Sequence, residues 1–92
     1  MANASQTVSY HLSPSNGAVE EADFGEIRPS RIHVMVPSSA KVHVRFHATS
    51  NANVNDYILP QGADCVFEVA SRRVSVYNDD STAKDVYICV EY

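Results

Sequence analysis

Three histidines that share the outward phase of two predicted strands are the residues of this sequence whose spacing could support metal chemistry. His33 lies in RIHVMV, and His43 and His47 lie in KVHVRFH, so all three would project from one side of extended strands. Zinc sites bring three or four nitrogen, sulfur or oxygen ligands together in a tetrahedron. Arg31 and Arg45 share the same phase and would repel a cation. We therefore expect no metal site here.

Two cysteines are the candidate nucleophiles, and a catalytic thiolate needs a positive, exposed environment with a base nearby. Cys65 is in phase with Phe67 and Val69, which predicts a core position. Cys89 has the opposite phase within its own segment, beside Tyr87, which indicates an interface. Two cysteines are too few for a disulfide scaffold, so we expect free thiols.

Serine and carboxylate chemistry has no recognisable motif in this chain. There is no G-x-S-x-G sequence, and the adjacent carboxylates Glu20–Glu21 and Asp79–Asp80 fall in predicted turns, as solvated loops do. We predict no catalytic residue, no cofactor and no enzyme activity.

Period-two alternation runs through almost the whole chain and predicts strands. In each strand segment, the apolar residues at alternate positions are expected to face inward. The segments are QTVSYHL, RIHVMV, KVHVRFH, CVFEV, RVSVY and DVYICVEY. Turn-forming sequences separate these segments every 8–12 residues or so. The pattern predicts an all-β fold: a small antiparallel β-sandwich, or a compact barrel, of about 7–8 strands. It forms one domain over residues 1–92, in which segment 1–30 is assigned least well, and AVEEADFGEI fits a short helical turn, a strand or a loop equally.

A hairpin between RIHVMV and KVHVRFH is predicted if Val36 pairs with Val42 across the loop PSSAK. Its outward side would form a basic face on an acidic protein. The predicted face is either solvated or a contact surface for an acidic partner, and it comprises Arg31, His33, Met35, His43, Arg45 and His47.

The closing segment VYICVEY is apolar on both faces. Val86, Ile88 and Val90 alternate with Tyr87 and Cys89, and such a strand is usually central or covered. We expect another subunit to cover its second face, with Tyr87, Cys89 and Tyr92 as interface residues and a homo-oligomer as the result.

The bulk composition restricts the classes of partner. The chain has 92 residues and a formal net charge of −4, and an acidic excess does not favour nucleic acid. No segment reaches the roughly 18 apolar residues of a membrane span, and the N-terminus has no secretory pattern. These features predict a protein made in a reducing cytoplasm.

From Ile32 onward the chain resembles small β-rich virion proteins of tailed bacteriophages. The resemblance is carried by VHVRFHAT, SNANVND, LPQG, CVFEV, VSV and VYICV, while SPSNGAVEEADFGEIRPS departs from it. It implies a non-enzymatic virion subunit, either a head decoration (cement) protein or a minor head–tail protein. Such a subunit would contact itself, the major capsid protein or another virion protein.

Two other functions remain open at this point. A carbohydrate- or ligand-binding sandwich would use loop residues such as Tyr57, Tyr77, Asn78 and Asp79. A small inhibitor of a host protein would also fit the size and the acidity.

Overall fold

The structure is a computed structural model that describes residues 6–36, 41–46, 51–53, 56–59 and 64–92. Within these ranges the chain forms strands and no helix, which confirms the all-β prediction. The eight strands are β1 (Thr7–Leu12), β2 (Val19–Asp23), β3 (Arg31–Met35), β4 (Val42–Arg45), β5 (Tyr57–Ile58), β6 (Asp64–Phe67), β7 (Arg73–Asn78) and β8 (Val86–Glu91).

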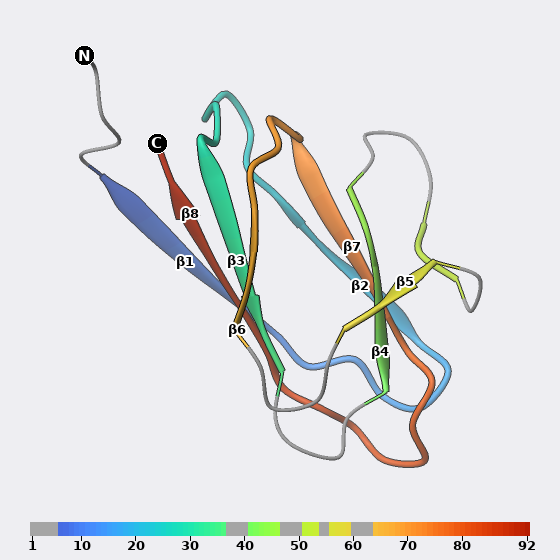
Figure 1. Ribbon diagram of the computed structural model, residues 1–92. Helices are drawn as coiled ribbons and strands as arrows, with labels where there is room; N and C mark the ends of the chain where they lie inside the picture. Colours follow the sequence, from blue (N-terminus) through green and yellow to red (C-terminus); the bar gives the residue numbers. More distant parts are fainter. Residues whose placement is uncertain (1–5, 37–40, 47–50, 54–55, 60–63) are drawn as a thin grey trace.

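Two four-stranded antiparallel sheets face each other and form a small sandwich (Figure 1). Sheet A has the order β1-β8-β3-β6, and sheet B has the order β2-β7-β4-β5. The predicted sandwich is therefore confirmed. β8 lies inside sheet A between β1 and β3, as its two apolar faces indicated.

The predicted hairpin between the segments around Val36 and Val42 is wrong. β3 pairs with β8 and β6 in sheet A, whereas β4 pairs with β7 and β5 in sheet B. Of the seven connections between these strands, only the one between β4 and β5 stays within a sheet. The alternation of apolar and polar residues specifies which face of a strand is buried. It does not specify whether the next strand along the chain pairs in the same sheet or lies in the opposite sheet.

The core lies between the sheets and is built from the predicted inward residues, most of them valines. The buried positions include Ile32, Val34, Val36, Val42, Val44, Val74, Val76, Val86, Ile88 and Val90. Val8, Tyr10, Leu12, Cys65, Phe67 and Val69 pack against this cluster from the edges and ends of the sheets. The predicted core position of Cys65 is thus confirmed, and both cysteines are free thiols.

The segment AVEEADFGEI, which fitted a helical turn, a strand or a loop equally, forms strand β2 and then a tight turn. The Asp23 carboxylate accepts a hydrogen bond from the Gly25 amide at 2.8 Å, and Gly25 has φ 65. A side chain at this position would strain the left-handed backbone, so glycine is the residue that suits the turn.

The sequence LPQG contributes a core residue at its start. Leu59 is 2% exposed, and its amide donates to the Val42 carbonyl at 2.8 Å. Leu59 therefore packs into the core directly after β5. Residues 60–63 lie outside the described residues.

Candidate functional site

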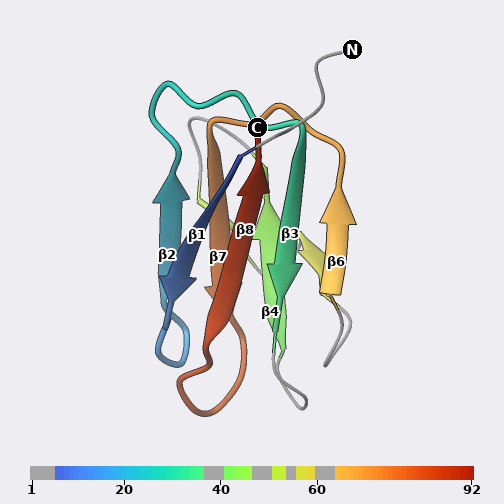
Figure 2. The same cartoon turned by 90° about the vertical axis from the view of Figure 1, so that its left-hand side faces the viewer.

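The outer face of sheet A, which is turned toward the viewer in Figure 2, is the candidate site. Successive side chains of a strand point to opposite sides of the sheet, so the residues that alternate with the core residues form this face. They are Thr7, Ser9 and His11 on β1; Tyr87, Cys89 and Glu91 on β8; Arg31, His33 and Met35 on β3; and Asp64 and Val66 on β6.

An apolar patch lies on this outer face, toward the end of β3 and the start of β8. Tyr87 is 47% exposed, Met35 39% and Val66 48%, and the half-buried Cys89 lies beside them. Strand register places Tyr87 directly opposite Met35. Residues this apolar on the exposed side of a sheet are typical of a surface that another molecule covers.

A shallow hollow of about 250 Å³ lies between β1 and the patch. Its lining includes Ser9, Met35, Tyr87 and Cys89, and most of the lining is apolar. The His11 ring stacks on the Tyr87 ring at 4.7 Å with an interplanar angle of 8°, which holds the tyrosine against β1. The hollow is smaller than most small-molecule sites, so it suits one inserted side chain better than a cofactor.

Charged side chains border the patch and pair with one another. His33 Nε2 contacts Glu91 Oε2, and its Nδ1 lies 3.7 Å from Asp64 Oδ1. The His33 hydrogen bond lowers the pKa of Glu91, and the Arg31 guanidinium, 3.5 Å from Glu91, lowers it further against the opposing effect of burial. Both ring nitrogens of His33 therefore face carboxylates. His33 Nε2 bonds Glu91 and not Cys89, its cross-strand neighbour.

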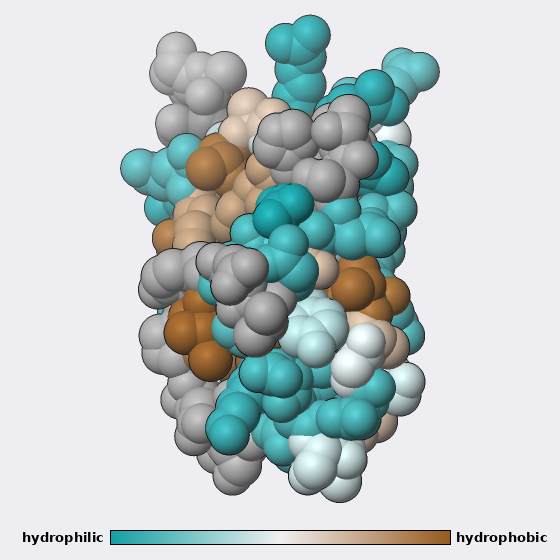
Figure 3. Space-filling view, turned by 90° about the vertical axis from the view of Figure 1, so that its right-hand side faces the viewer, coloured by the Kyte–Doolittle hydropathy of each residue, from teal (hydrophilic) through white to brown (hydrophobic). Residues whose placement is uncertain are grey.

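The outer face of sheet B differs because the chain covers it with its own segment. The Ala52 amide donates to Ser75 Oγ at 2.8 Å, and His43 Nδ1 donates to the Asp56 carbonyl at 3.0 Å. Ser75 and His43 are consequently 0% and 6% exposed although both point outward. In Figure 3, which shows this side, hydrophobic residues form small separate patches in a largely hydrophilic surface.

The Asp56 carboxylate fastens this covering segment. Burial alone would raise its pKa, but the hydrogen bonds from the Asn53 amide and the Arg45 guanidinium, together with the charge of Arg45, lower it overall. Arg45 Nη2 lies 2.9 Å from Asp56 Oδ1. His43 and Arg45 thus hold the chain's own loop, and His43 is buried beneath it.

The predicted basic face is divided between the two sides of the sandwich. Arg31, His33 and Met35 lie on the outer face of sheet A, and His43 and Arg45 lie on that of sheet B. His47 is outside the described residues. The division follows from the wrong hairpin, because strands in different sheets cannot share an outer face.

Tyr92 is half-buried beyond the end of β8, where its amide and carbonyl pair with Gln6. The other interface predictions on β8, Tyr87 and Cys89, lie on the outer face of sheet A with the phase that the sequence predicted. Among the described residues, no group of three or more histidine, cysteine or acidic side chains could hold a metal ion.

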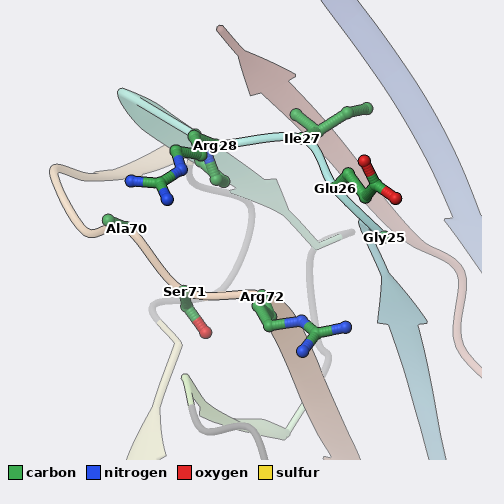
Figure 4. Close-up of a pocket in the computed structure, with 8 residues that line it drawn as sticks. Gly25, Glu26, Ile27, Arg28, Ala70, Ser71 and Arg72 are labelled. Carbon is green, nitrogen blue, oxygen red and sulfur yellow. The ribbon is translucent and has the colours of Figure 1, made fainter.

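A second hollow, of about 500 Å³, lies at one end of the sandwich between residues 25–29 and 70–72 (Figure 4). Arg28 and Arg72 line it together with Glu26, so its charge favours an anionic group. The neighbouring Arg73 pairs with Glu21 at 2.9 Å.

Asn78 was a candidate ligand contact in the carbohydrate hypothesis, but it is 0% exposed. Its amide nitrogen donates to the carbonyls of Pro14 at 2.9 Å and Thr82 at 2.8 Å, and its oxygen accepts from the Asp80 amide at 2.8 Å. The side chain joins two loops to β7 and is not accessible to a sugar.

Two functional features were missed in the sequence. The pairing of His33 with Glu91 could have been found, since Glu91 continues the outward phase of Tyr87 and Cys89. The covering of Ser75 and His43 by residues 51–53 and 56 carries no period-two signal and requires the tertiary structure.

Comparison of the chain with protein-family models, with curated proteins and with solved structures found no match. In the ranges that the structure describes, there is no helix of the length and apolarity needed to cross a membrane.

Proposed function

We propose that this protein is a non-enzymatic structural subunit of a bacteriophage virion and that it assembles through the outer face of sheet A. The partner is a protein, either another copy of the chain or a capsid or head–tail component. The virion setting is supported by the sequence resemblance of the segments from VHVRFHAT to VYICV. The choice of surface is supported by the structure of the two sheets.

The observation that carries the proposal is the difference between the two outer faces. Residues 51–53 and 56 cover Ser75 and His43 on the outer face of sheet B, whereas the apolar patch around Tyr87 has no such cover among the described residues. A small domain buries a modest share of its surface, so covering this patch in an assembly would add stability.

Two single variants, Val66→Lys and Ile58→Lys, test the proposal, because the two residues are equally exposed on different sheets. Val66 is 48% exposed on the outer face of sheet A, and Ile58 is 49% exposed on the edge strand of sheet B. The measurement is the copy number of each variant in purified particles of the phage, by quantitative mass spectrometry, after its folding has been checked by circular dichroism.

We expect the wild-type protein and Ile58→Lys at the same symmetric copy number, and Val66→Lys strongly depleted. Absence of the wild-type protein from particles would refute the virion assignment. Equal retention of both variants would refute the assignment of the surface.

A further inference from the structure

We propose that the outer face of sheet A binds the same face of a second copy of the chain. The two-fold axis runs parallel to the strands, between β8 and β3. This inference rests on the proposed use of that face for assembly, and it names the partner. An isologous contact requires a surface that complements itself, and the strand register allows that requirement to be checked.

The register arranges the outer face in rows across four strands. His11, Tyr87, Met35 and Asp64 form one row in the order β1-β8-β3-β6. Arg31 and Glu91 are neighbours in a second row, nearer the start of β3.

A two-fold axis between β8 and β3 exchanges the strands, so that β1 faces the partner's β6 and β8 faces the partner's β3. Tyr87 then lies against the partner's Met35, Arg31 against the partner's Glu91, and His11 against the partner's Asp64. Apolar residues meet apolar residues, and every charged residue in these pairs meets an opposite charge or an imidazole. The rotation of about 30° between packed sheets moves the outer pairs by distances that these side chains can span.

The other axis that brings the two faces together, perpendicular to the strands, gives poorer contacts. It would place Asp64 against the partner's Glu68, which follows β6, and Tyr87 against the partner's Glu91. The like charges of Asp64 and Glu68 disfavour that arrangement. Charge complementarity therefore selects the axis parallel to the strands.

The size of the face sets the strength of the dimer. Four strands about 4.8 Å apart and four to six residues long cover a footprint on the order of 350 Å². Stable complexes bury about 800 Å² per partner, so we expect a weak dimer, with dissociation in the micromolar range or above.

His11 and Asp64 provide the test because they lie on opposite edge strands of the sheet. Three strand spacings, about 14 Å, separate them within one chain, and salt screens most of their interaction. They come together only across the proposed dimer. The experiment is sedimentation velocity of the full chain up to several hundred micromolar, with variants H11E, D64K and H11E/D64K, and with E26K as a control for the change in charge.

Each single variant should weaken dimerisation about tenfold, since both symmetric His11–Asp64 contacts are lost. The double variant should dimerise more strongly than either single variant, because it restores a pair of opposite charges although it lacks the ring stack of His11 on Tyr87, and E26K should match the wild type. A double variant that is as weak as the single ones, or a wild-type protein that remains monomeric throughout, overturns the dimer.

The two proposals fail in different ways. A monomeric protein that is nevertheless present in purified particles contradicts this dimer and supports the proposed function. A dimer whose two charge variants compensate, with no copies in particles, supports this inference and contradicts the virion assignment.

Discussion

Replacing Asn78 with leucine should destabilise the fold strongly, although the sequence places this residue in a polar, turn-forming stretch. The Asn78 side chain makes three hydrogen bonds in a fully buried setting, to Pro14, Thr82 and the Asp80 amide. Leucine has a similar branched shape, but it is larger and has no polar atom. Each lost buried hydrogen bond costs about 1 kcal/mol, and the stranded backbone groups add to this, which gives about 3–4 kcal/mol.

Such a loss is large for this domain, whose whole stability we expect to be about 5–14 kcal/mol from its length. Equilibrium unfolding in guanidinium chloride, followed by circular dichroism, measures it directly. With a slope of about 2 kcal/mol per molar, the midpoint should fall by about 1.5–2 M.

Asn16→Ala is the matched control, because Asn16 is an exposed asparagine whose side chain bonds the Asp80 carbonyl in the same corner. Its midpoint should change by less than about 0.5 M, since water replaces the lost bond. A midpoint for Asn78→Leu within the range of this control would refute the reasoning that the buried amide holds the two loops.

Three further results are expected. The stability difference between the wild type and Asp56→Asn should be full above pH 3.8 and should vanish as the pH falls through the lowered pKa of Asp56; a difference that persists at low pH contradicts the role of Asp56 and Arg45 in holding the cover. Burial, aided by the nearby Asp64 charge, raises the pKa of Cys65, so iodoacetamide should label it more slowly than Cys89 in dilute protein, and equal rates by mass spectrometry would count against its core position. Ile88→Ala should cost about 2–5 kcal/mol in denaturant unfolding because Ile88 is 1% exposed at the centre of sheet A, and a loss below about 1 kcal/mol would be inconsistent with that packing.

Alternation in the sequence predicted which side chains are buried, but not which strands are neighbours. Ile32, Val34, Val42 and Val44 all face the core as expected. Their strands nevertheless lie in different sheets, because a short polar loop can turn within a layer or cross to the other layer. Non-local pairing of this kind depends on the whole set of strands.

The same alternation also predicted the burial of one polar residue, which its residue type alone did not indicate. Asn78 continues the inward phase of Val74 and Val76, so its burial was visible in the pattern. Its asparagine chemistry suggested a turn or a ligand contact instead. His43 shows the opposite limit: its outward phase was correct, yet a distant segment buries it.

The central claim is that the outer face of sheet A is covered in the assembly, and hydroxyl-radical footprinting of purified particles tests it most directly. Met35 and Tyr87 are exposed on this face and react readily with the radical, while Tyr77, on sheet B, serves as the internal reference. Oxidation rates of the free protein at high dilution are compared with those of the protein in particles. The account predicts strong protection of Met35 and Tyr87 in particles with little change at Tyr77, and equal rates at Met35 and Tyr87 in the two states would contradict it.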